Sequence, residues 1–137
     1  MTKVTLIRPG ARKATCPDWL DGEARKEWKR IAPALHRMAR LEPLFSGPLS
    51  IYCSDFAFWM RIRRELAELK STRRISGQRL NSQEFVKWCG ILERLARQWY
   101  RDAKKMAREF GFPMTEQGMD LTHPLRLTRR SGRRGKK

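Results

Sequence analysis

Hydrophobic side chains recur at helical spacing in the first part of the chain. They are separated by steps of 4, 3, 4 and 3 residues, in the order Ala24, Trp28, Ile31, Leu35 and Met38. Such spacing places them on one face of an α-helix. Asp21 suits the N-cap, and Glu23 suits the positive end of the helix dipole. The pattern predicts a helix of about residues 21–39, with a kink or break between residues 30 and 32 because Pro33 interrupts it.

A second helical pattern follows a loop that ends at Pro48, a residue suited to a first helical position. Its apolar stripe consists of Tyr52, Phe56, Trp59, Ile62, Leu66 and Leu69. We expect a long amphipathic helix of about residues 48–70. The segment 71–80 is polar, basic and contains glycine, so it is interpreted as a connector or a short irregular hairpin.

The third pattern begins at Asn81, which forms a capping-box-like pair with Glu84. Its seam steps by 4 and 3 without a miss through Phe85, Cys89, Leu92, Ala96, Trp99, Ala103, Met106 and Phe110. Gly111 supplies a C-terminal stop. The pattern predicts a helix of about residues 81–110, with a second apolar edge formed by Trp88, Ile91 and Leu95.

These patterns predict an all-α fold in which a short N-terminal helix packs across one end of a long antiparallel helical hairpin. The second apolar edge has two open explanations, self-association or contact with another part of the same chain. Residues 112–125 form a short C-terminal segment, for which we expect a turn of helix after Thr115. We expect disorder from Arg126 onward.

Charge divides the chain into a central domain and two basic arms. The 137 residues include 31 Lys and Arg against 14 Asp and Glu, a net charge of +17. Residues 1–15 and 126–137 contain four and seven basic residues and no acid, whereas residues 16–125 carry 20 basic and all 14 acidic residues. We therefore expect a flexible arm over 1–15, one domain over 16–125 and a disordered tail over 126–137.

This charge favours a polyanionic partner, with nucleic acid first and an anionic membrane second. The alternative is that the tails only aid solubility. The three cysteines are far apart and form no C-x-x-C pair, so no disulfide framework or zinc site is expected. No signal-peptide core and no run of 18 apolar residues is found, which favours a soluble intracellular protein without a membrane partner.

Catalytic motifs are missing from the sequence. It contains no P-loop, no G-x-S-x-G and no H-E-x-x-H. His36 and His123 lie 87 residues apart without ligand partners, and the acids alternate with bases as on a solvated helix face. We expect neither an enzyme nor a metal or cofactor. Basic residues in the connector and at the end of the third helix favour phosphate contact instead, without a helix-turn-helix for base readout.

Several short motifs resemble one protein family when they are taken in order. They are P-D-W-L at 17–20, R-I-A-P-A-L at 30–35, the aromatics Tyr52 and Trp59, a G-x-x-x-N step at 77–81 and E-F-G-F at 109–112. Together they resemble the small terminase subunits of tailed phages, the P27-like group, over about residues 16–121. Two features depart from that group: Ser82 follows Asn81 in place of proline, and P-M-T-E-Q-G replaces a T-P-x-x-R ending.

The resemblance implies a non-enzymatic protein that forms a ring of identical subunits, binds double-stranded viral DNA and regulates the large terminase ATPase-nuclease. It implies action in the host bacterial cytoplasm, not in the mature virion, for a phage, a prophage or a phage-related island. Trp19, Leu20 and Trp28 would fasten the first helix to the hairpin. The expected oligomerisation residues are Trp59, Leu66, Trp88, Ile91, Leu95 and Trp99.

The expected DNA-binding residues are Arg8, Arg12, Lys13, Arg25, Lys29, Arg73, Arg74, Arg129, Arg130, Arg133 and Arg134. The C-terminal tail has a second interpretation as a docking peptide for the large subunit. Two other functions compete with the terminase reading. One is a small basic nucleic-acid-binding transcriptional regulator. The other is a nuclease or nucleotide-handling enzyme, which would need carboxylates or histidines that the fold brings together.

Overall fold

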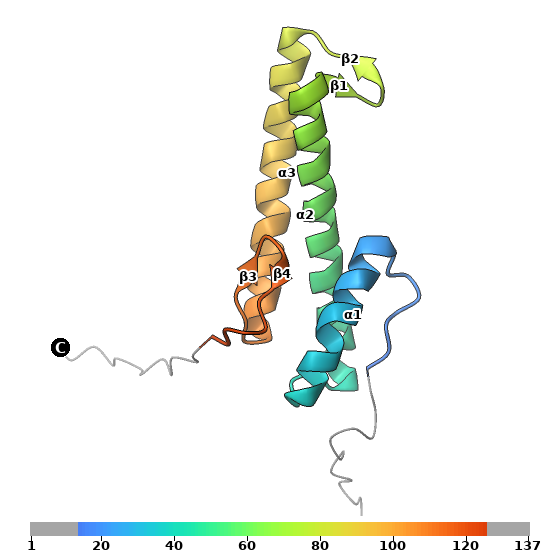
Figure 1. Cartoon of the computed structure of the whole chain (residues 1–137), viewed down its shortest axis with the longest axis vertical. Helices are drawn as coiled ribbons and strands as arrows, with labels where there is room; N and C mark the ends of the chain where they lie inside the picture. Colours follow the sequence, from blue (N-terminus) through green and yellow to red (C-terminus); the bar gives the residue numbers. More distant parts are fainter. Residues whose placement is uncertain (1–13, 126–137) are drawn as a thin grey trace, which may run out of the picture.

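A computed structural model describes residues 14–125 as a mostly helical chain (Figure 1). The helices are α1 (Gly22–Arg37), α2 (Ser46–Thr72) and α3 (Ser82–Glu109), and a 3₁₀ turn at Pro43–Phe45 precedes α2. Two antiparallel two-stranded sheets complete the fold: β1 (Arg74–Ile75) with β2 (Gln78–Arg79), and β3 (Met114–Thr115) with β4 (Gly118–Met119). The mostly helical class is therefore confirmed, with two small sheets, of which only the hairpin in the connector was among the predicted alternatives.

The helices α2 and α3 lie side by side along their length and form the body of the molecule (Figure 1). Trp59 and Tyr100 contact each other with ring centroids 5.2 Å apart. The predicted capping box is present, because Glu84 N–H donates to Asn81 Oδ1 at 2.9 Å and Asn81 N–H donates to Glu84 Oε2 at 3.2 Å. Gly111 follows α3 with φ of +86°, the left-handed conformation that ends a helix at low cost.

The connector between α2 and α3 is a β-hairpin, the second of the two predicted alternatives. Arg74 pairs with Arg79, and Ile75 pairs with Gln78. The turn residues Ser76 and Gly77 have φ of +50° and +77°, as a two-residue hairpin loop with the right-handed strand twist requires.

Two details of the helix starts differ from the prediction. Asp21 occupies the N-cap position of α1 but makes no side-chain capping bond; its Oδ2 lies 3.8 Å from Arg61 Nη2 instead. Pro48 is the third residue of α2 rather than the first. A proline is tolerated there because the first amides of a helix have no intrahelical acceptor.

Pro33 does not break α1, contrary to one of the two expected outcomes. The helix continues from Gly22 to Arg37 with Pro33 inside it. Pro33 lies on the exposed side of α1, where water can bond the carbonyl that a proline leaves without its donor.

The C-terminal segment forms the hairpin of β3 and β4, so the turn of helix expected after Thr115 is wrong. Met114 and Met119 pair across the hairpin and are 7% and 1% exposed. Gly118 has φ of +104°, which a helix cannot contain. The physical reason is that burying the two methionines and using the left-handed glycine favour a tight turn at this end.

A hydrophobic core lies at the foot of the molecule, where α1 packs against α2 (Figure 1). Leu20 and Trp28 are 2% and 4% exposed, so both fasten α1 as predicted. Trp19 is 65% exposed and does not. Its neighbour Leu20 takes the buried position, because the turn that closes with Leu20 N–H donating to Pro17 O directs only one of the two inward.

A buried polar network ties the β3–β4 hairpin to α1 and α2. Glu27 is 4% exposed, and its Oε1 accepts from Tyr52 Oη at 2.8 Å and from Arg30 Nη2 at 2.6 Å. Met119 N–H donates to Tyr52 Oη at 2.6 Å, and Arg30 Nη2 donates to Met119 O at 2.9 Å. Burial and the Glu27 charge raise the pKa of Tyr52. A side chain at Gly118 would collide with this group, since a β-carbon there would lie 2.5 Å from Glu27 Oε1.

The Tyr52→Phe variant tests this network. It removes the hydroxyl that serves both Glu27 and Met119, and we expect a loss of about 1–3 kcal/mol in the free energy of unfolding, measured by urea denaturation. The matched control is Tyr100→Phe, because the Tyr100 hydroxyl makes no hydrogen bond within residues 14–125. Equal losses for the two variants would contradict the role given to the network.

Candidate nucleic-acid and self-association surfaces

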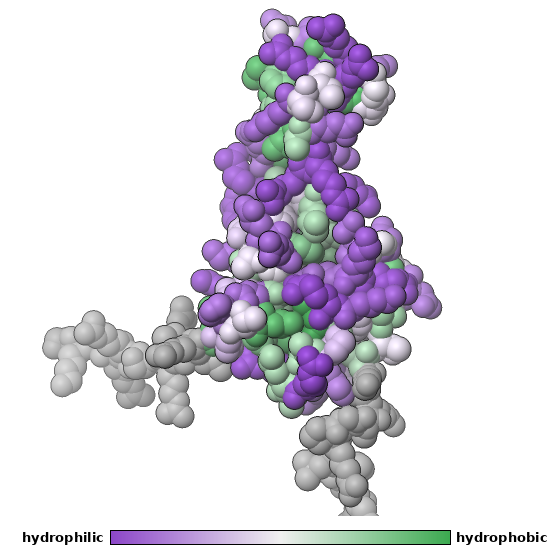
Figure 2. Space-filling model, viewed as in Figure 1, coloured by the Kyte–Doolittle hydropathy of each residue, from purple (hydrophilic) through white to green (hydrophobic). Residues whose placement is uncertain are grey.

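All seven basic residues of α3 lie along one exposed line of the helix. At about 100° per residue they fall within an arc of about 100°, on the side of α3 opposite its seam with α2. We call this set the basic stripe: Lys87, Arg94, Arg97, Arg101, Lys104, Lys105 and Arg108. The four acids of α3 all fall outside this arc. Figure 2 shows the abundance of hydrophilic side chains along the hairpin of helices on one face of the molecule.

The basic stripe differs from the exposed arginines of α2 in its ion pairing. Arg64 Nη2 lies 2.9 Å from Glu23 Oε1, and this contact lowers the pKa of Glu23. Arg61 and Arg63 pair at 3.8 Å with Asp21 and Glu116. Within residues 14–125, no member of the basic stripe forms an ion pair. The positive charge of α2 is therefore compensated locally, whereas that of α3 is not.

One flank of the α2–α3 pair exposes apolar side chains from both helices. Phe58 of α2 stacks on Trp99 of α3, with ring centroids 4.9 Å apart. Ile51, Phe58, Trp88 and Leu95 are 50%, 43%, 38% and 42% exposed. We call this set the apolar strip: Ile51, Phe58, Trp88, Ile91, Leu95 and Trp99. Ile51 and Phe58 were missed because the α2 pattern alone cannot show which side chains border α3.

Trp59 and Leu66, the remaining expected oligomerisation residues, lie on the opposite flank. Trp59 is only 6% exposed and belongs to the core of its own chain. With Leu66, Arg63 and Tyr100 it lines a shallow groove of about 490 Å³, which we call the flank groove. The structure therefore divides the predicted set between two different surfaces.

Four of the eleven predicted DNA contacts lie in the described residues, in two pairs at opposite ends of the molecule. Arg25 donates to the backbone oxygens of Leu20, Pro17 and Asp18, which holds the segment before α1 in place. Arg73 lies over the Phe85 ring, 4.9 Å from its centroid, at the other end of the molecule (Figure 1). Arg74 and Lys29 are exposed. The other seven lie outside the described residues: Arg8, Arg12, Lys13, Arg129, Arg130, Arg133 and Arg134.

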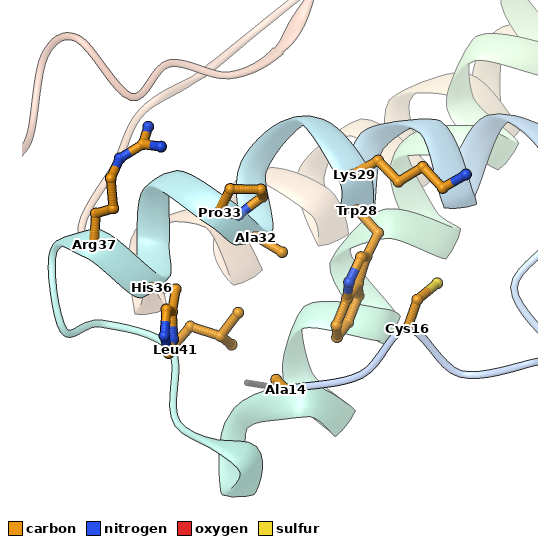
Figure 3. A pocket seen from close by; sticks show the side chains of 9 residues that line it. All are labelled: Ala14, Cys16, Trp28, Lys29, Ala32, Pro33, His36, Arg37 and Leu41. Atoms are coloured by element: carbon orange, nitrogen blue, oxygen red, sulfur yellow. The ribbon is translucent and has the colours of Figure 1, made fainter. Parts of the chain in front are cut away.

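Lys29 borders a half-open, mainly apolar pocket of about 520 Å³ beside α1 (Figure 3). Trp28 and His36 line it from the same side of α1, and Leu41 closes one end. Neither ring nitrogen of His36 has a hydrogen-bond partner within the described chain. Among the described residues that line it there is no carboxylate, and the Cys16 thiol donates to Pro17 O and not to His36, so no pair of nucleophile and base is formed.

The described residues contain no other arrangement typical of an active site. Over 14–125, no three His, Cys, Asp or Glu side chains gather as a metal site. Cys16, Cys53 and Cys89 are free thiols. In the same residues no helix has the length and apolar character needed to cross a bilayer. The prominent features are thus surfaces, one basic and two apolar.

These features define a basic, mostly helical protein whose long helical pair has one side of uncompensated positive charge and two apolar flanks. Comparison with known protein families matches residues 24–119 to phage terminase, small subunit. The chain belongs to this family, whose members are generally non-catalytic subunits with a role in phage DNA packaging. The comparisons with curated proteins and with solved structures gave no match.

The buried carboxylate of Asp55 in α2 makes the stability of the fold depend on pH. Asp55 is 9% exposed. Burial, and secondly repulsion from Asp102, raise the pKa of Asp55 from 3.8 to about 6. At pH values between these two pKa values, Asp55 keeps its proton in the folded protein but has released it in the unfolded chain. The contribution of Asp55 to the free energy of unfolding therefore falls as pH rises from about 4 to about 6, and is constant above that.

We expect the Asp55→Asn variant to lose this fall in stability between about pH 4 and pH 6, because its amide does not titrate. Thermal unfolding of variant and parent at several pH values measures the difference. Asp18→Asn, at an exposed carboxylate, serves as the control and should follow the parent. A difference between Asp55→Asn and parent that is independent of pH would contradict the assignment.

Proposed function

We propose that this chain is the DNA-recognising small subunit that starts viral genome packaging, acting as a ring of identical copies. The family supports a role in phage DNA packaging. The observation that supports assembly is the apolar strip, in which Trp88, Leu95 and Phe58 are each more than a third exposed. An exposed patch of large apolar side chains on a small protein is typical of a protein interface.

The two flanks of the antiparallel α2–α3 hairpin support a ring. The apolar strip lies on one flank, and the flank groove, with Leu66 and Tyr100, lies on the other. An interface between two different surfaces joins subunits head to tail, and such contacts close into a ring when the rotation per subunit fits. In this proposal the apolar strip of one copy packs into the flank groove of the next.

The bound DNA is double-stranded viral DNA, and the ring recruits and regulates the large terminase subunit, which carries the ATPase and nuclease. The acid-free terminal segments, 1–15 and 126–137, suit DNA contact through phosphate neutralisation. The tail also suits docking to the large subunit. These steps belong to the host cytoplasm, so the protein has no place in the finished virion. The P27-like group is the proposed subfamily.

Two complementary variants test the head-to-tail interface. Leu95→Glu places a charge in the apolar strip, and Leu66→Glu places one in the flank groove. We expect each alone to weaken association by about tenfold or more, because an unpaired carboxylate would be buried. An equimolar mixture should form dimers, since one intact strip can meet one intact groove. Analytical ultracentrifugation measures the species, and thermal melts check that each variant folds.

Gln83→Glu is the control, because Gln83 is exposed on the outer side of α3, away from both flanks. It adds the same charge and should assemble as the parent does. Unchanged assembly of Leu95→Glu, or a mixture that stays monomeric while each variant is folded, would contradict the ring. A stable dimer in place of a ring would favour a small transcriptional regulator.

A further inference from the structure

We propose that the basic stripe of α3 is the surface that holds the phosphate backbone of double-stranded nucleic acid in this protein. This inference rests on the proposed function for DNA binding as such. It goes further by locating the contact on the outer face of one helix, and not in the connector or on α1.

The first argument is the sorting of charge around α3. All seven bases lie within an arc of about 100°, and the four acids lie outside it. Glu93, the acid nearest the arc, has its Oε1 3.3 Å from Lys70 Nζ of α2. Glu116, which lies near Arg97 and Arg101 at the flank groove, is paired with Arg63. The neighbouring acids are thus engaged with α2, and the basic stripe keeps its positive charge.

The second argument is that most described arginines outside the basic stripe already have partners, and that the exposed exceptions, Arg37, Arg74 and Arg79, lie at the end of α1 and in the β1–β2 hairpin. Arg61, Arg63 and Arg64 are each paired with a carboxylate. Arg25 is occupied by three backbone carbonyls, and Arg73 lies against Phe85. A phosphate would have to displace these contacts, whereas the side chains of the basic stripe are exposed and lose only bound water and counterions.

The third argument is shape. From Lys87 to Arg108 the basic stripe extends about 31 Å along a helix, at 1.5 Å per residue. This is close to one turn of duplex, about 34 Å. Gly90 lies within the arc, and a β-carbon there would meet no atom within 4 Å, so the backbone can approach a ligand closely. A rigid polyanion of this length matches the stripe.

A duplex fits this face better than an anionic membrane does. A helix that lies on a bilayer needs a broad apolar face for insertion beside its basic one. The apolar side of α3 packs against α2, and Val86 is the one large apolar residue within the arc. The basic stripe therefore offers charge to an anionic surface but lacks the apolar side chains that would insert into a bilayer.

The basic stripe also remains accessible in the proposed ring. The apolar strip and the flank groove lie on the two flanks of the α2–α3 pair, whereas the basic stripe lies on the outer side of α3. Arg97 and Arg101 border the flank groove, and contacts through the flanks leave the other five members of the stripe uncovered. Rotational symmetry places the stripes of all copies at equivalent positions in the assembly. The bases of successive copies would then form one continuous positive band.

The test compares two triple variants with equal changes in charge. The stripe variant is Arg94→Gln, Lys105→Gln and Arg108→Gln, and the control is Arg61→Gln, Arg64→Gln and Lys70→Gln, none of which lines the flank groove. Binding to a duplex of about 30 base pairs is measured by fluorescence anisotropy over a range of salt concentrations. If each replaced residue contacts one phosphate, the slope of log K against log salt falls by about 2.7 for each bound copy of the stripe variant. The control keeps nearly the parent slope.

Both variants are first checked by thermal melts and by sedimentation, so that a loss of folding or assembly is not taken for a loss of contact. An unchanged slope in the stripe variant, or equal losses in the two, overturns the inference while leaving the proposed function in place. If the unaltered protein binds no duplex even at low salt, both this inference and the proposed function fail. If the stripe variant lost the parent's binding to phosphatidylserine vesicles but still bound the duplex as the parent does, the inference would be overturned in favour of a membrane.

Discussion

The fold depends on one buried carboxylate, Glu27, and on the donors that surround it. An unpaired charge at that depth would cost several kcal/mol, so α1, α2 and the β3–β4 hairpin must all approach closely enough to supply Arg30, Tyr52 and the Met119 amide. Since these groups come from segments up to 92 residues apart, the carboxylate fixes the foot of the molecule in one arrangement. The remainder of α2 and α3 extends from that foot.

This arrangement also decides which charges remain available. The segment before α1, α1 itself and the β3–β4 hairpin bring Asp21, Glu23 and Glu116 to the arginines of α2. Nothing in residues 14–125 does the same for the outer side of α3. In the sequence, the basic residues look evenly spread along the helices. In the folded chain, carboxylates compensate the positive charge of α2 but not that of α3. The surface proposed for DNA is a product of packing and not of local composition.

The sequence was sufficient for the features that depend on local periodicity and capping. Side-chain spacing was enough to predict the three helices, the seam of α3 and the capping box of Asn81 and Glu84. The order of the motifs was enough to predict the family. It was not sufficient where a long-range contact decides. Three features depend on contacts between segments that are far apart in the chain. They are the exposure of Trp19, the β3–β4 hairpin and the placement of Trp59 and Leu95 on different flanks of the α2–α3 pair. The basic stripe could have been found by placing the bases of α3 on a helical wheel, since all seven share one arc.

The central claim is that the flanks of the α2–α3 pair join identical copies into a closed ring. Native mass spectrometry of the nuclease-treated, unaltered protein over a range of salt concentrations tests it most directly, because it counts subunits without requiring the cognate DNA. The account predicts one closed oligomer larger than a tetramer, which persists at high salt because its interface is apolar. A monomer or dimer at every salt concentration would contradict it.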